Sequence, residues 1–282
     1  MWGVRIAPIL AAAGVVVALS GCDPVDGAQP GGGTSGATYV ALGDSYSTGL
    51  GTKGSDPAKC HQSATSYPAL IAEETGWTYT NVACPGAISW TLTGTQLYAV
   101  SDKTDQVTVT IGGNDVLFHM VLTGCPGGAA MCDARIASGR DYIAKTMPGT
   151  LKTVYGAIRR AAPKAKVTVL GYPQVFGKDP SCLAPGYPVT AQAAAAANKV
   201  FLELDAAIAK AAKAARFTFV PVDKAFAGHG TCTKTPWIHG FDPAFPAELL
   251  HPNTAGHRAY AKAALKVLAP AKTDGDKAAG KS

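Results

Sequence analysis

Short apolar runs alternate with longer segments of helical character along most of this chain. Strands that alternate with helices of this length indicate a parallel sheet covered on both faces. We therefore predict an α/β fold: a three-layer α/β/α sandwich with a mainly parallel five-stranded sheet. The expected strands are Tyr39–Leu42, Thr78–Val82, Gln106–Ile111, Lys166–Leu170 and Phe217–Val220. The expected helices are Tyr67–Thr75, Arg140–Ala162, Thr190–Ala215 and Thr254–Val267.

Two of these helices carry additional signals. The helix expected over Thr190–Ala215 is rich in alanine, and its Val200, Leu204 and Ile208 are spaced to form one apolar stripe. Asn253 or Thr254 can cap the last helix. Both signals support the helical interpretation.

The N-terminus has the character of an export signal. Arg5 precedes a mostly apolar stretch from Ile6 to Leu19, which is too short for a comfortable membrane span. The stretch closes with Leu-Ser-Gly-Cys ending at Cys22, which resembles the lipobox of bacterial lipoproteins. That resemblance implies that residues 1–21 are a signal peptide and that Cys22 carries a lipid anchor at the extracellular side of the membrane. The alternative is an ordinary signal peptide with an incidental cysteine and a freely secreted protein.

Composition divides the remaining chain into three parts. Residues 22–37 are rich in Gly, Pro, Ser and Thr and are expected to be a flexible tether. Residues 38–268 form the expected folded domain, and residues 269–282 an expected disordered tail. The whole chain is 47% hydrophobic and only 16% charged, which excludes general disorder.

The net charge of +6 is not concentrated in one long basic run. The densest clusters lie within Arg159–Lys166 and Lys210–Arg216, and we interpret both as solvated helix faces. No nucleic-acid partner is expected, and we expect a monomer.

The seven cysteines also fit export. Lipidation of Cys22 leaves six, which can form three disulfides outside the cytosol. The alternative, a zinc site, lacks support because no Cys-x-x-Cys pair occurs. Six cysteines allow 15 connectivities, among which local loop closure favours pairing in chain order. The expected pairs are Cys60–Cys84, Cys125–Cys132 and Cys182–Cys232.

Candidate chemistry lies at the ends of the expected strands and before the last helix. Gly43-Asp44-Ser45 follows the first strand, and open α/β sheets bind their ligands at such strand ends. A glycine turn containing Gly86 follows the second strand, and Gly112-Gly113-Asn114 follows the third. His251 precedes the last helix. Each segment alone is a common turn or cap, so the signal is their joint occurrence.

Together these segments resemble the SGNH subgroup of the GDSL hydrolases, also called GDSL lipases or esterases. Ser45, Gly86, Asn114 and His251 match the four name-giving positions in chain order, and the resemblance spans roughly residues 38–268. It implies a flavodoxin-like sandwich and hydrolysis of carboxylic esters through an acyl-enzyme, with no metal or organic cofactor. Ser45 would be the nucleophile and His251 the general base. The oxyanion donors would be the backbone N–H groups of Ser45 and Gly86 and the side-chain amide of Asn114.

One position departs from the family pattern. The family commonly has Asp three residues before the histidine, whereas this chain has Glu248. Either Glu248 orients the imidazole, or a nearby backbone carbonyl does so and leaves a Ser–His dyad, since orientation needs only an acceptor. Four other histidines are alternative bases with less supporting context: His61, His119, His229 and His239. His257 lies within the expected last helix, six residues after His251, and should not share a face with it.

The substrate remains open between several classes. The aromatic residues within Trp237–Phe245 either line an acyl pocket or pack the loop. The leading hypothesis is an esterase or lipase acting on lipids or acylated small molecules. The alternatives are an acetyl esterase acting on polysaccharide and a lipoprotein that binds a glycan or lipid without turnover.

Overall fold

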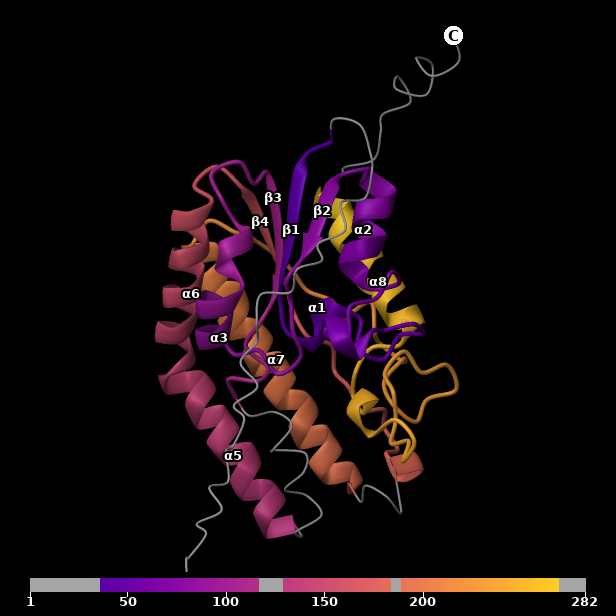
Figure 1. Cartoon of the computed structure of the whole chain (residues 1–282). Helices are drawn as coiled ribbons and strands as arrows, with labels where there is room; N and C mark the ends of the chain where they lie inside the picture. Colours follow the sequence, from indigo (N-terminus) through magenta and orange to yellow (C-terminus); the bar gives the residue numbers. More distant parts are fainter. Residues whose placement is uncertain (1–35, 117–128, 184–188, 269–282) are drawn as a thin grey trace, which may run out of the picture.

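A computed structural model of the chain describes residues 36–116, 129–183 and 189–268 (Figure 1). Several predicted features lie outside these ranges: the signal peptide, Cys22, nearly all of the tether, Cys125, His119 and the C-terminal tail.

The predicted sheet is present, and its five strands are all parallel in the order β2-β1-β3-β4-β5. Each strand lies within one residue of its predicted bounds, because buried β-branched and aromatic side chains mark the strands clearly. β1 lies between β2 and β3, so the ends of these three strands are neighbours. The strands are β1 (Thr38–Gly43), β2 (Thr78–Asn81), β3 (Gln106–Thr110), β4 (Lys166–Leu170) and β5 (Thr218–Val220).

Helices cover both faces of the sheet, as the predicted three-layer sandwich requires (Figure 1). One face carries α2 (Tyr67–Thr75) and α8 (Thr254–Leu268). The other carries α3 (Ser89–Thr95), α6 (Met147–Ala161) and α7 (Ala191–Ala214). α5 (Ala129–Lys145) packs against α7 and extends past the ends of the strands.

The prediction of one helix over Arg140–Ala162 is wrong. Two helices, α5 and α6, meet at Thr146, and the first begins well before Arg140. Pro148 lies in the first turn of α6, where its missing N–H costs nothing, whereas inside a continuous helix it would remove a hydrogen bond. The hydrophobic periodicity runs across this break, so the pattern alone does not show it.

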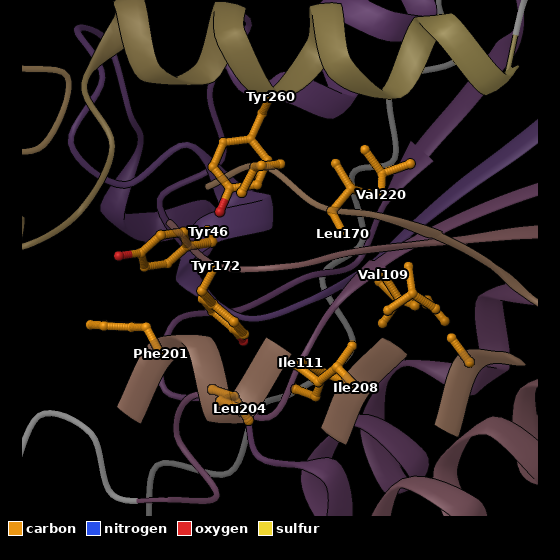
Figure 2. Close-up of a cluster of buried hydrophobic side chains, with 14 of the residues drawn as sticks. Tyr46, Val109, Ile111, Leu170, Tyr172, Phe201, Leu204, Ile208, Val220 and Tyr260 are labelled. Carbon is orange, nitrogen blue, oxygen red and sulfur yellow. The ribbon is translucent and has the colours of Figure 1, made fainter. Parts of the chain in front are cut away.

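The core is filled from both helical layers. Figure 2 shows Tyr260 of α8 on one side of the strands and Leu204 and Ile208 of α7 on the other. The predicted stripe on α7 is confirmed, because Val200, Leu204 and Ile208 are all fully buried. Helix capping follows the sequence as well, since the Asn253 side chain accepts hydrogen bonds from the backbone N–H groups of the first turn of α8.

Two of the expected disulfides are present in the structure: Cys60–Cys84 and Cys182–Cys232. The third expected pair, Cys125–Cys132, includes a residue outside the described ranges. Among the described helices, none is both long enough and apolar enough to cross a bilayer.

Candidate active site

The candidate nucleophile stands at the end of the central strand. β1 ends at Gly43, whose φ of +132° favours glycine, and a Cβ there would clash with the carbonyl oxygen of Thr110. The Gln96 side chain fixes this point, because it accepts from the Gly43 N–H at 2.8 Å and donates to the Gly43 carbonyl at 2.9 Å. The chain therefore turns at one defined position before reaching Ser45.

A short helix, α1 (Ser45–Thr48), begins directly after this turn. Asp44 caps it, since one carboxylate oxygen accepts a hydrogen bond from the backbone N–H of Tyr46 at 3.0 Å. Ser45 is thus the first residue of α1 and is 6% exposed. The cap holds the backbone of Ser45 at the strand end.

The structure brings Ser45 and His251 together from opposite ends of the domain. The hydroxyl oxygen of Ser45 lies 2.8 Å from Nε2 of His251. On the other side of the ring, Nδ1 lies 3.0 Å from the carbonyl oxygen of Leu249. A carbonyl can only accept a hydrogen bond, so Nδ1 carries the proton and Nε2 of the neutral ring is left as an acceptor. This is the tautomer that can take a proton from the serine.

Burial of the imidazole favours its neutral form. Desolvation lowers the pKa of His251 from 6.5 to about 4, although the hydrogen bond to the Leu249 carbonyl opposes this change. The ring is therefore neutral, and available as a base, throughout the neutral pH range.

Glu248 does not lie behind the base. Its carboxylate is 3.7 Å from Nε2 of His239 and makes no hydrogen bond with the His251 ring. The backbone carbonyl of Glu248 accepts a hydrogen bond from the His251 N–H at 3.0 Å. Of the two acceptors that the sequence left open, the geometry places the Leu249 carbonyl at Nδ1.

The two other predicted site positions flank Ser45, because β2 and β3 are the neighbours of β1. Gly86 follows β2 with φ of +76°, and a Cβ there would meet open space. Its backbone conformation thus accounts for glycine at this position. Asn114 follows β3, and its side-chain amide donates to the Ala87 carbonyl at 3.1 Å, which ties the two strand-end loops together.

Asp115 strengthens the connection between these loops. Its carboxylate accepts from both the backbone N–H and the hydroxyl of Ser89, at 3.0 and 3.1 Å for the nearer oxygen. The loops that carry the expected oxyanion donors are therefore held in a fixed relative position.

Tyr172, which sequence reasoning missed, joins the ends of three strands. It follows β4, and its hydroxyl donates to the carboxylate of Asp44 while accepting from the Gly113 N–H at 3.1 Å. The carboxyl of Asp44 is fully enclosed, and burial raises its pKa to about 7 against the effect of these hydrogen bonds. A tyrosine two residues past a strand end is the only sequence signal for this contact.

Tyr46 connects the segments that carry Ser45 and His251. It follows Ser45 directly, and its hydroxyl donates to the Leu250 carbonyl at 2.6 Å. Leu250 adopts φ of +61°, an unusual conformation for a leucine, within the turn that carries His251. The hydroxyl of Tyr46 therefore supports the turn that presents the imidazole to Ser45.

Comparison with known proteins agrees with this geometry. Residues 41–259 match the GDSL-like lipase/acylhydrolase family. The chain belongs to this family. A lipase of Streptomyces rimosus is 41% identical over 77% of this chain and 81% of its own length. Lipase 1 of Streptomyces coelicolor is 36% identical over 85% of this chain and 88% of its own. The protein is therefore an ester hydrolase.

Solved structures show the same relationship for this GDSL-family hydrolase. The extracellular lipase of Streptomyces rimosus superposes with a TM-score of 0.75 at 40% identity, over 80% of this chain and 97% of that one. Phospholipase A1 of Streptomyces albidoflavus gives a TM-score of 0.76 at 33% identity, over 81% and 98%. An acetyl-xylooligosaccharide esterase of Geobacillus shares the fold at a TM-score of 0.51 and 18% identity, over 82% and 94%.

Three other histidines of the hydrolase make contacts away from the Ser45 hydroxyl. His257 is buried and accepts a hydrogen bond from the Tyr67 N–H at 3.2 Å. His239 lies with Nε2 2.6 Å from the Gly51 carbonyl, and His229 stacks on Trp237. These contacts give each ring a structural role.

The aromatic segment before His251 divides between packing and exposure. Trp237 packs against Phe226 and His229. Phe245 is 58% exposed and lines a hollow of about 920 Å³ together with Leu50 and Glu248.

Nowhere in the described ranges do three His, Cys, Asp or Glu side chains gather in a way that could hold a metal ion.

Proposed function

We propose that this hydrolase cleaves carboxylic esters through an acyl-enzyme on Ser45, with His251 as the general base. The observation that carries the proposal is the 2.8 Å contact between the Ser45 hydroxyl and Nε2 of His251, in a ring whose Nδ1 is committed to the Leu249 carbonyl. A serine hydroxyl is a weak nucleophile without such a partner.

The proposed reaction has two halves. In the first, the Ser45 oxygen attacks the ester carbonyl carbon while Nε2 of His251 accepts the hydroxyl proton. The tetrahedral intermediate then collapses, the bond to the alcohol oxygen breaks, and His251 returns the proton to the leaving alcohol. In the second half, water gives a proton to His251 and attacks the acyl carbon, which releases the carboxylic acid and restores Ser45.

Negative charge develops on the carbonyl oxygen in both halves. We assign its stabilisation to the backbone N–H groups of Ser45 and Gly86 and to the amide of Asn114, which lie at three adjacent strand ends. The interlocked loops support this assignment, because donors that are held in place need no reorganisation as charge develops.

Replacement of Ser45 tests the proposal. Ser45→Ala is expected to abolish hydrolysis of a short-chain p-nitrophenyl ester while the circular dichroism spectrum and thermal unfolding stay as in the wild type. Ser47→Ala is the matched control, because Ser47 lies on the same short helix and its hydroxyl contacts Tyr67 instead of His251. Retained activity in Ser45→Ala would contradict the nucleophile assignment.

For the substrate we propose acyl lipids in preference to acetylated polysaccharide. Relatives at 33–41% identity are named lipase and phospholipase A1, whereas the acetyl-xylooligosaccharide esterase matches at only 18%. A series of p-nitrophenyl esters separates the two classes. Turnover that persists with long acyl chains supports the lipid substrate, and turnover confined to acetate contradicts it.

We further propose that the protein is exported, that Cys22 anchors it at the extracellular side of the membrane, and that it acts as a monomer. The signal-like segment before Cys22 supports export, and so do the two disulfides, which form in oxidising compartments. Mass spectrometry of the mature N-terminus tests the anchor. A diacylglyceryl cysteine at position 22 is expected, and an unmodified one contradicts the anchor.

A further inference from the structure

The two basic clusters of the sequence meet at one groove. The end of α5, the length of α6 and the C-terminal half of α7 border a groove of about 1220 Å³, and no described residue that lines it is acidic. Small apolar side chains such as Ala207 and Ala211 of α7 lie between the cations. We call this feature the basic groove and define it by Lys152, Arg159, Arg160, Lys210 and Arg216.

Four of these cations have no counter-ion among the described residues. Within the described part of the chain, no ion pair joins Lys152, Arg160, Lys210 or Arg216 to a carboxylate, and all four are exposed. Arg159 differs, because its guanidinium donates to the Pro163 and Ala165 carbonyls and lies 4.8 Å from the Phe217 ring centre. Arg159 thus builds the wall of the groove, and the other four present free positive charge.

Arg216 has a backbone conformation that favours glycine or asparagine over arginine. It follows the C-terminus of α7 with φ of +57°, in the left-handed conformation where glycine or asparagine is usual. A side chain with a Cβ is disfavoured there. Local backbone preference therefore does not account for the arginine.

The charged end of the basic groove lies toward the edge of the sheet where the strands begin, and its lining reaches back to Pro148 at the start of α6. α6 leads into the start of β4, and α7 leads into the start of β5, so the C-terminal ends of both helices approach the edge where the strands begin. Thr38, the first residue of β1, lies at that same edge, whereas Ser45 follows the opposite end of β1 (Figure 1).

The charges are too widely spread to converge on one small anion. Lys152 and Arg160 are separated by about 12 Å along α6, given a rise of roughly 1.5 Å per residue. Lys210 and Arg216 stand on the opposite wall, with apolar side chains between the two walls. A surface that offers many phosphates beside apolar groups matches this arrangement better than a single bound phosphate.

We propose that the basic groove docks the domain on an anionic phospholipid bilayer. None of the residues that line the basic groove belongs to the Ser45 site, so docking leaves that site free to act on esters. The docking depends on neither the Ser45 mechanism nor acylation of Cys22, and it adds an electrostatic contact to whatever the N-terminal segment contributes.

Vesicle binding of the full chain tests the proposal. Sedimentation with phosphatidylcholine vesicles that contain about one-third phosphatidylglycerol is compared with sedimentation on pure phosphatidylcholine. The groove variant combines K152Q, R160Q, K210Q and R216Q. The control variant removes the same charge from exposed lysines elsewhere and combines K178Q, K224Q, K234Q and K262Q. All three proteins share one N-terminus, so its own membrane affinity cancels in the comparison.

The wild type and the control variant are expected to prefer the anionic vesicles, and the groove variant is expected to bind them at least about tenfold more weakly. Arg216→Gly alone is expected to weaken binding while thermal stability stays the same or rises, which separates charge from folding. Hydrolysis of a soluble ester is expected to be equal in all of them. Equal binding by groove and control variants, or no preference for anionic vesicles, overturns the proposal. The proposal is also overturned if the wild type binds soluble polyphosphate but no vesicles, even when the groove variant loses the polyphosphate binding.

Discussion

Nδ1 of His251 lies 3.0 Å from the carbonyl oxygen of Leu249, two residues earlier in the same turn. The orienting group of the base is thus a backbone atom, and the nearby carboxylate of Glu248 faces His239. A carbonyl fixes the tautomer as an acid would, but it supplies no negative charge to stabilise the imidazolium formed during catalysis. The predictions below follow from this arrangement and from the strand-end network around it.

Replacing Glu248, whose carboxylate faces away from the His251 ring, should reduce activity only slightly. Glu248→Gln is expected to reduce kcat/KM by less than tenfold, or less than about 1.4 kcal/mol, because the Leu249 carbonyl still holds Nδ1. Steady-state kinetics with a soluble ester checks this, with His251→Ala as the variant that must lose activity. A loss of a hundredfold or more in Glu248→Gln would show that the carboxylate acts on the base.

The acidic limb of the pH profile should lie unusually low. Burial lowers the pKa of His251 from 6.5 to about 4, and the base works only when neutral. We therefore expect kcat/KM to hold through pH 6 and to fall by half near pH 4. A half-point near pH 6.5 would contradict the assignment of a buried base.

The same pKa change affects stability in a defined direction. Below pH 6.5 the unfolded state binds a proton at this histidine that the folded state resists until about pH 4, so the contribution of His251 to stability is lost as pH falls through that window. Two measurements separate protonation of His251 from unfolding. Initial rates at low pH report the protonation, and thermal unfolding at the same pH values reports the loss of stability.

Removing the hydroxyl of Tyr172 should destabilise the strand-end loops that position Ser45 and Gly113. Tyr172→Phe leaves the Asp44 carboxylate and the Gly113 N–H without their shared partner, and we expect a loss of about 1–3 kcal/mol in the free energy of unfolding. Because Tyr172 is a positioning residue, Tyr172→Phe should lower kcat more than it raises KM. Denaturant titration and kinetics measure both effects.

Tyr155→Phe is the matched control for this change. The Tyr155 hydroxyl is equally buried but has no hydrogen-bond partner in the described structure, so its removal should be neutral or stabilising. Equal effects of the two substitutions would argue against a specific role for the Tyr172 hydroxyl.

The oxyanion assignment predicts a loss confined to turnover. Asn114→Ala removes one donor, and kcat is expected to fall by roughly 10²–10³ with little change in KM. Thermal unfolding checks that the loop survives without the contact to the Ala87 carbonyl. A decrease in kcat of only a few-fold in a folded variant would remove Asn114 from the oxyanion site.

Most strands and helices of the fold could be predicted because their sequence signals are local. Buried strands such as Gln106–Thr110 identify themselves by β-branched residues, and the stripe on α7 identifies the face toward the core. α1 escaped detection because four residues are too few to show a helical period. The break at Thr146 escaped because periodicity continues through it.

The parts of the site that could not be predicted depend on atoms or distances that a sequence does not display. Every residue has a carbonyl, so nothing marks Leu249 as the partner of His251. Tyr172 and Asp44 are 128 residues apart, and only the adjacent ends of β1, β3 and β4 explain their contact. The first contact depends on the local geometry of one turn, and the second on the way strand ends assemble.

Covalent trapping of the nucleophile tests the central claim most directly. A fluorophosphonate should react with the wild type to give one adduct, located on Ser45 by peptide mass spectrometry, because the activated serine oxygen displaces fluoride. Ser45→Ala should give no adduct, and Glu248→Gln should react at nearly the wild-type rate. An adduct on another residue, or ester hydrolysis by a protein in which Ser45 never becomes labelled, would contradict the proposed mechanism.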